Sequence, residues 1–175
     1  MAETPKHKHI KDKNITIRVI LLMISDSLSS ANEEQRAKLD RSSKIAEAII
    51  KEQGLEVLDV KYIPDEIKII QENIKRYIEQ QIELIITMGG TGISKRDVTP
   101  DAIRPLLQKE LPGFGELFRS LTYNDVGTVS IMSRALAGIK DESVITCLPG
   151  SPNAVQLGVN LILKEILHLC NLLKS

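Results

Sequence analysis

One glycine-rich turn collects most of the side chains that could do chemistry. Residues 84–101 run LIITMGGTGISKRDVTPD, so an apolar stretch leads directly into two glycines and a third follows. Backbone N–H groups of such a turn can point at an anion because glycine has no Cβ, and Thr91 and Ser94 add hydroxyl donors. The turn lacks the Lys-Ser/Thr ending of a P-loop and the third in-register glycine of a dinucleotide fingerprint. A tight strand-to-helix turn without a ligand explains the glycines about equally well.

Three adjacent charges, Lys95, Arg96 and Asp97, follow this turn. A solvated loop is the ordinary explanation for such a run, but this one lies between a glycine turn and a helix start. Arg96 could grip a phosphate bidentately, and Asp97 could hold a magnesium ion. Asp65 follows another predicted strand, where it could supply a second carboxylate or cap the next helix.

The elements that would position these residues alternate along the chain. Apolar, β-branched runs predict strands at 15–24, 55–63, 83–88 and 143–148, and helical spacing predicts helices at 39–53, 67–78, 114–121 and 153–173. Thr99-Pro100 and Ser151-Pro152 each combine an N-cap residue with a proline suited to the first helical position. Residues 127–139 are harder to assign and could form a hairpin. This order predicts an α/β fold with a mostly parallel sheet covered on both faces.

Polar or special residues follow each predicted core strand. They are Ser25-Asp26-Ser27, Pro64-Asp65-Glu66, Gly89-Gly90-Thr91-Gly92 and Pro149-Gly150-Ser151-Pro152. Ligands of parallel α/β sheets bind outside the carboxyl ends of the strands. The sequence therefore predicts one rim that carries all four turns, with a site along it.

The composition of the chain argues against several classes of partner. Its 175 residues favour one domain, at 14–175, after a flexible tail at 1–13. The 23 basic and 23 acidic residues balance, and tryptophan is absent, so neither nucleic acid nor a membrane surface is an expected partner. No apolar run is long enough to span a bilayer, and the N-terminus lacks the apolar core of a secretory signal. Two cysteines make no disulfide framework, and a cytoplasmic location is expected.

Four motifs, taken in order, resemble the MoaB/MogA family of molybdenum cofactor biosynthesis and the gephyrin G domain. They are GGTGISKRDVTPDAI, PGFGELFR, SRALAGI and LPGSPNAV, and the resemblance covers about residues 15–167. It implies a three-layer α/β/α domain that forms trimers, some pairing into hexamers. It also implies an adenylyltransferase that takes molybdopterin and magnesium-ATP and releases pyrophosphate.

The residue chemistry and the resemblance together assign the candidate site. Asp65 and Asp97 are expected to act in catalysis and to hold Mg²⁺. The positions expected to bind molybdopterin or nucleotide are Ser25, Asp26, Ser27, Gly89, Gly90, Thr91, Gly92, Ser94, Arg96, Thr99, Pro149, Gly150, Ser151 and Pro152. Arg119 and Arg134 receive no position from the sequence.

One departure from the family pattern and two alternative functions stay open. Asp40-Arg41-Ser42-Ser43 ends in serine where the family often has glycine, which leaves open where the following helix starts. The first alternative is a non-catalytic molybdopterin carrier or scaffold, which would bind the pterin without turning over ATP. The second is a CinA-like nucleotide hydrolase on the same fold, which would hydrolyse ADP-ribose without a pterin.

Overall fold

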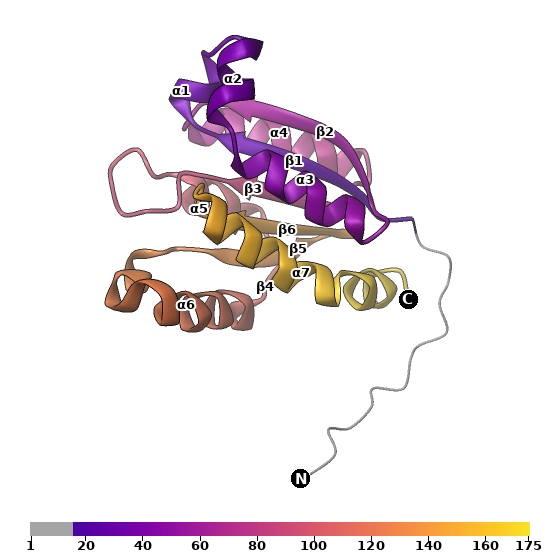
Figure 1. Ribbon diagram of the computed structural model, residues 1–175. Coiled ribbons are helices and arrows are strands. Elements are labelled where there is room, and N and C mark those ends of the chain that lie inside the picture. The colour runs from indigo at the N-terminus through magenta and orange to yellow at the C-terminus, as the bar shows by residue number, and fades with distance from the viewer. Residues whose placement is uncertain (1–15) are drawn as a thin grey trace.

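A six-stranded sheet forms the middle of the molecule (Figure 1). The computed structural model describes residues 16–175, so the tail predicted at 1–13 lies outside the described residues. The strands are β1 (Arg18–Ile24), β2 (Glu56–Ile63), β3 (Leu84–Met88), β4 (Lys109–Glu110), β5 (Leu136–Lys140) and β6 (Ser143–Leu148). Their order is β2-β1-β3-β6-β5-β4. The first four in this order are parallel, β5 pairs antiparallel with β6, and β4 pairs antiparallel with β5, which confirms a mostly parallel sheet.

Helices cover both faces of this sheet. The α-helices are α1 (Asp26–Ser29), α2 (Glu33–Leu39), α3 (Ser42–Glu52), α4 (Ile67–Glu79), α5 (Thr99–Ile103), α6 (Pro112–Val126) and α7 (Pro152–Leu173), with 3₁₀ turns η1 (Arg104–Leu106) and η2 (Gly127–Met132). Helices α3, α6 and α7 pack on one face, and α4 and α5 pack on the other. The three-layer α/β/α fold is confirmed. Among residues 16–175, no helix combines the length and the apolar character needed to cross a membrane.

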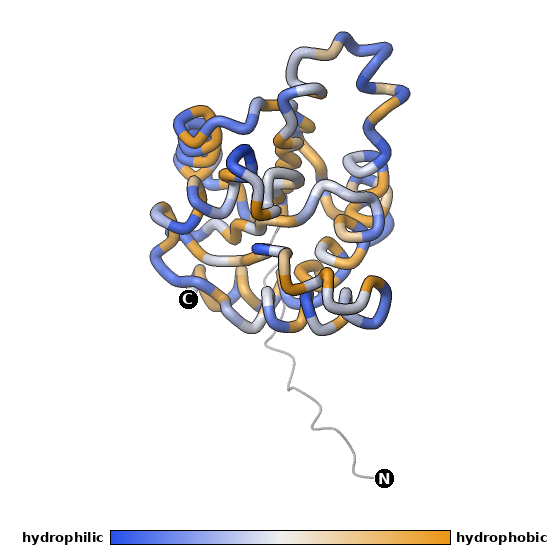
Figure 2. Tube along the Cα trace, turned by 90° about the vertical axis from the view of Figure 1, so that its left-hand side faces the viewer, coloured by the Kyte–Doolittle hydropathy of each residue, from blue (hydrophilic) through white to orange (hydrophobic). Residues whose placement is uncertain are grey.

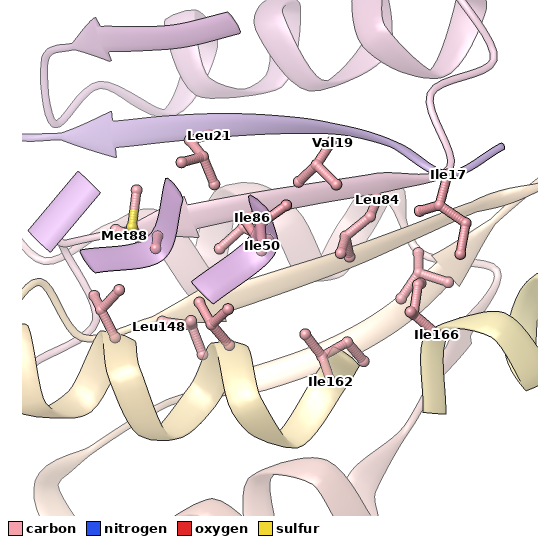
Figure 3. Close-up of a cluster of buried hydrophobic side chains, with 14 of the residues drawn as sticks. Ile17, Val19, Leu21, Ile50, Leu84, Ile86, Met88, Leu148, Ile162 and Ile166 are labelled. Atoms are coloured by element: carbon pink, nitrogen blue, oxygen red, sulfur yellow. The ribbon is translucent and has the colours of Figure 1, made fainter. Parts of the chain in front are cut away.

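Both faces of the central strands are buried, which explains why their sequences are apolar without alternation. In β1, Val19 and Leu21 point into the cluster shared with α3 and α7, while Ile20 and Leu22 point into the cluster shared with α4. Figure 3 shows the first cluster, where Ile50 of α3 and Ile162 of α7 meet the strand side chains. The sheet is thereby fixed in register, and with it the rim at its carboxyl ends.

The predicted start of the helix over 39–53 is wrong by three residues, because the chain breaks at Asp40 between α2 and α3, while the helix itself is confirmed as α3. The backbone of Asp40 is extended (φ −86°, ψ 100°). Its buried carboxylate accepts hydrogen bonds from the Ser43 N–H (2.9 Å) and from the Tyr62 hydroxyl (2.8 Å). Asp40 thus satisfies an N–H of the first turn of α3, so the helix starts at Ser42 although Ser43 replaces the usual glycine.

The hairpin suggested over 127–139 is also wrong. Residues 127–132 form the 3₁₀ turn η2, and the strand that follows pairs antiparallel with β6. The hairpin is therefore β5–β6, and it turns at Asp141, whose φ is +52°. Burial explains this choice of partner, because Leu136 and Ile139 are covered in the β5–β6 pair. The helix predicted over 114–121 is real but longer, at Pro112–Val126.

Candidate functional site

The carboxyl ends of β1, β2, β3 and β6 lie along one edge of the sheet, because these strands are parallel. Figure 2 looks at the molecule from the left-hand side of Figure 1, where the loop joining β3 to α5 protrudes. Backbone hydrogen bonds connect neighbouring strand ends, from Ser25 N–H to the Ile63 carbonyl and from Gly89 N–H to the Leu148 carbonyl (both 2.9 Å). All four predicted turns therefore follow the strands on one rim.

Asp26 and Asp65 face each other across the ends of β1 and β2. The Asp65 N–H donates to Asp26 Oδ1 (3.0 Å), and the Asp26 N–H donates to Asp65 Oδ2 (3.2 Å). Asp65 does not cap α4, because Glu66 occupies the N-cap position and no side chain caps that helix. Burial raises the pKa of Asp65 above its ordinary value, and the negative charges of Asp26 and Asp97 add to this shift, although the Asp26 N–H opposes it.

Asp97 lies in the loop after β3, where its surroundings lower the pKa of its carboxyl, whereas those of Asp65 raise it. Its Oδ2 accepts a hydrogen bond from the Ser94 N–H (2.8 Å). Hydrogen bonds from Ser94 lower the pKa of Asp97, and backbone bonding from Gly92 and the charge of Arg134 reinforce the shift against partial burial. Asp97 is therefore ionised at a lower pH than Asp65. Its carboxylate lies against the glycine turn, since a Cβ at Gly92 would be 2.9 Å from Asp97 Oδ2. Its negative charge also contributes to the raised pKa of Asp65.

The side chains of Asp65 and Thr99 converge on Gly90. Its φ is +62°, a conformation that favours glycine. A Cβ at this position would lie 2.3 Å from Thr99 Oγ1 and 2.6 Å from Asp65 Oδ1. Both side chains therefore reach the same small volume beside the glycine turn.

Thr99 does not act as the predicted N-cap. Val98 occupies the cap position of α5, and Thr99 is the first helical residue. Its side chain is fully buried, and its hydroxyl oxygen has no hydrogen-bond partner within residues 16–175. A buried polar atom left unpaired costs about 1–3 kcal/mol, and this hydroxyl lies beside Gly90 and Asp65, whereas the only other such oxygen among the described residues, that of Thr146, lies in β6.

Arg134, a residue to which sequence reasoning assigned no role, holds the glycine turn in place. Its backbone N–H donates to the Thr91 carbonyl (3.1 Å), and its Nε donates to the Gly92 carbonyl (2.8 Å). Its Nη2 donates to the Asp97 carbonyl, and its Nη1 donates to both carboxylate oxygens of Asp101 (2.9 and 3.1 Å). The available signal was the arginine of SRALAGI, one of the four motifs, directly before a buried strand.

Arg96, from the loop after the glycine turn, lies against the first predicted turn, Ser25-Asp26-Ser27. Arg96 forms an ion pair with Asp26 (3.3 Å), and its side chain is 82% exposed. The Ser25 hydroxyl lies 3.0 Å from the Ser27 hydroxyl, and it also accepts from the Leu28 N–H (3.4 Å). Arg96 is therefore near the acids yet free to exchange its partner.

The proline-glycine turn after β6 lies against the glycine turn. A Cβ on Gly150 would be 3.3 Å from the Cα of Gly89, so the two backbones are in close approach. The Ser42 hydroxyl donates to the Gly150 carbonyl (2.7 Å). Ser151 is the N-cap residue of α7, as predicted, with Pro152 following, but its side chain makes no capping hydrogen bond. The Ser151 hydroxyl therefore remains available at a helix N-terminus, a favourable place for an anion.

Comparisons with known proteins agree with this architecture. The family model described as probable molybdopterin binding domain (MoCF_biosynth) matches residues 20–168. Molybdenum cofactor biosynthesis protein B of Staphylococcus aureus is 39% identical over 168 residues, which cover 94% of this chain and 95% of that protein. A crystal structure of a molybdenum cofactor biosynthesis protein B is 36% identical with a TM-score of 0.83, and covers 93% of this chain and 99% of its own. The tungsten cofactor synthesizing protein MoaB of Pyrococcus furiosus is 32% identical with a TM-score of 0.77, and covers 91% and 98%.

The match to this family model, together with the three-layer α/β/α fold, places the domain in the class of molybdopterin-binding domains. The chain belongs to the MoaB/MogA family, and its role lies in molybdenum cofactor biosynthesis. The resemblance of its four motifs to this family is confirmed.

Proposed function

We propose that this chain adenylates molybdopterin, using magnesium-ATP and releasing pyrophosphate. The observation that carries the proposal is the convergence of Asp65, Asp97 and the unpaired Thr99 hydroxyl on the glycine turn. A rim with two acids of different pKa beside backbone N–H donors suits a reaction that joins two phosphates.

The residues fit a magnesium ion that is shared with a substrate. Within residues 16–175, no three carboxylate, thiol or imidazole side chains lie close enough to hold a metal by themselves. Magnesium usually takes one or two carboxylates and completes its shell with water and substrate phosphates. Asp97, ionised and exposed to the rim, would hold the ion, with Asp65 as the second carboxylate. The bound ion would supply charge neutralisation to the pyrophosphate leaving group.

The protein's own groups would position the two substrates. A terminal phosphate oxygen of molybdopterin attacks the α-phosphorus of ATP, and the bond from that phosphorus to the pyrophosphate oxygen breaks. The N–H groups of the glycine turn would donate to a phosphate. Arg96 would leave Asp26 for a phosphate, because an exposed ion pair contributes only about 0–1 kcal/mol. No proton transfer is required from the attacking phosphate, so the site acts by orientation and charge.

The test is turnover with α-labelled ATP, molybdopterin and Mg²⁺, run on the wild type and on Asp97→Ala. We expect adenylated pterin and pyrophosphate from the wild type. The variant should lose turnover by about 10²-fold or more, with pterin affinity changed much less. Pterin bound without product under any divalent metal would favour the carrier, and hydrolysis of ADP-ribose without pterin would favour the hydrolase. Equal loss of binding and turnover in Asp97→Ala would argue against a catalytic role.

We also propose a homo-oligomer. The support is a set of exposed apolar side chains on α6 and η2: Leu117, Leu121, Val126, Val129, Ile131 and Met132. An exposed apolar patch of this kind often marks an interface. Light scattering on the purified protein would give the mass directly, and a monomer at micromolar concentration would contradict the proposal.

A further inference from the structure

Tyr62 lies at the carboxyl end of β2, where its ring and its hydroxyl contact different parts of the chain. It pairs in register with Met23, close to the end of β1. The guanidinium carbon of Arg36 lies 4.7 Å from the centre of the ring, and the hydroxyl donates to Asp40 Oδ2 (2.8 Å). The proposed reaction uses neither contact. One side chain therefore touches both α2 and the residue at which α2 ends and α3 is about to begin.

The contact with Arg36 supports the turn after β1. Nε of Arg36 donates to the Leu28 carbonyl (2.9 Å), and Nη2 donates to the Ser29 carbonyl (2.7 Å). The last carbonyls of a helix have no partner within it, and an arginine can satisfy them. Neither α1 nor α2 has a buried residue, so core packing does little to fix either helix. Arg36, stacked on Tyr62, therefore holds α1, which begins at Asp26.

The contact with Asp40 supports the proline-glycine turn after β6. Asp40 is 2% exposed, and within residues 16–175 it makes no ion pair. A buried carboxylate without a cation depends on its hydrogen bonds, and Tyr62 and Ser43 donate them. Asp40 fixes the first turn of α3, where the Ser42 hydroxyl donates to the Gly150 carbonyl (2.7 Å). Loss of the Tyr62 hydroxyl should therefore loosen the start of α3 and, with it, this turn.

We propose that Tyr62 is a positioning residue that holds two turns of the rim at once. Its ring fixes Ser25-Asp26-Ser27 by way of Arg36, and its hydroxyl fixes the proline-glycine turn by way of Asp40. Strands β1 and β6 are the two neighbours of β3 in the sheet, so these turns lie on either side of the glycine turn. Tyr62 thereby sets the width of the site between them. Its part in catalysis rests on the proposed function, since these turns are expected to bind the substrates of that reaction.

The test measures amide hydrogen exchange in variants that each remove one contact. Tyr62→Phe keeps the ring and loses the hydroxyl, so amides at 150–155 should exchange about tenfold faster or more, with a smaller change at 25–30. Arg36→Lys keeps the charge and loses the planar fork, so the opposite pattern is expected, with faster exchange at 25–30. Mass spectrometry of the digested protein reads both segments without any ligand.

Tyr77→Phe is the matched control. The Tyr77 hydroxyl also donates to an aspartate, Asp59 Oδ2 of β2 (3.0 Å). Tyr77 lies near the end of α4 that leads into β3, opposite the rim. This variant should lower Tm without changing exchange at either turn. In the adenylation assay, Tyr62→Phe and Arg36→Lys should lower kcat by about tenfold or more, whereas Tyr77→Phe should keep the wild-type kcat.

Equal exchange at 150–155 in Tyr62→Phe and Tyr77→Phe would overturn the positioning role. If Tyr62→Phe fails to fold, Arg36→Lys decides the matter, because α2 has no buried residue, and unchanged exchange at 25–30 would then overturn it. The two proposals fail separately. Wild-type turnover that is indifferent to Tyr62 would refute the positioning role alone, and altered exchange in a protein without any turnover would refute the enzyme alone.

Discussion

Replacing Gly90 by alanine should lower the adenylation rate by more than backbone strain alone would, and a control variant can separate the two effects. At φ +62° an L-residue costs about 1–2 kcal/mol. The new Cβ would also stand 2.3 Å from Thr99 Oγ1, whereas an ordinary C···O contact is about 3.3 Å. The Thr99 hydroxyl must therefore move by roughly 1 Å, and Asp65 must move as well. A displacement of that size in a reacting site can cost about 100-fold in rate.

Gly54→Ala is the matched control. Gly54 has nearly the same backbone conformation, at φ +72°, but a Cβ there would meet nothing within 4 Å. Both variants should lose about 1–2 kcal/mol of stability, which lowers Tm by about 2–8 °C for a domain of this size. Only Gly90→Ala should lose adenylation, by about 100-fold relative to the control.

Thermal melting and the adenylation assay on the two variants measure these effects side by side. Turnover of Gly90→Ala within a few-fold of Gly54→Ala would refute the reasoning, because it would mean that Thr99 and Asp65 are not needed where they lie. Equal inactivity of both variants would refute it too, since strain alone would then account for the loss.

Two further predictions concern residues away from that glycine. Arg134→Lys keeps the charge but loses the planar fork, so the turn should loosen; we expect turnover to fall by about tenfold or more with a smaller change in Tm, and an unchanged rate would contradict the positioning role. Glu83 is nearly buried, and hydrogen bonds from Arg18 and Lys174 outweigh burial to lower the pKa of this acid. A lowered carboxyl pKa adds stability above the unfolded-state pKa, and that stability is lost as pH falls through the folded value. Melting from pH 7 to pH 3 should therefore show a steeper loss in the wild type than in Glu83→Gln, which starts about 1.5–3 kcal/mol less stable; parallel curves would exclude Glu83 as the cause.

The core of the fold was predictable because burial on both faces leaves a strong apolar signal. The four parallel strands and the rim followed from that signal. The helix predicted from residue 39 starts three residues later, at Ser42. The apolar spacing extends back to Leu39, and spacing alone does not show that the Asp40 carboxylate binds an N–H of the first turn. The β5–β6 hairpin was missed because a strand in the core carries no local mark of its partner.

The candidate site was predictable at the turns and unpredictable between them. Asp65 and Asp97 each follow a predicted strand, and this position was enough to place both on one rim. It did not show whether Asp65 caps the next helix or belongs to the site. Thr99-Pro100 resembles a cap motif because threonine suits that role, and only packing shows that its hydroxyl is buried beside Gly90. Arg134 acts across 42 residues of sequence on Gly92, so no local pattern could place it.

The reciprocal hydrogen bonds between Asp26 and Asp65 couple these two residues energetically. Each side chain holds the backbone N–H of the other, so removing one carboxylate also releases the main chain at the end of the neighbouring strand. Effects measured at either position alone will include that release and will not add in the double variant. The cost of the first substitution will already contain part of the second. A double-mutant cycle, rather than any single variant, is the measurement that separates the chemical role of Asp65 from its structural role.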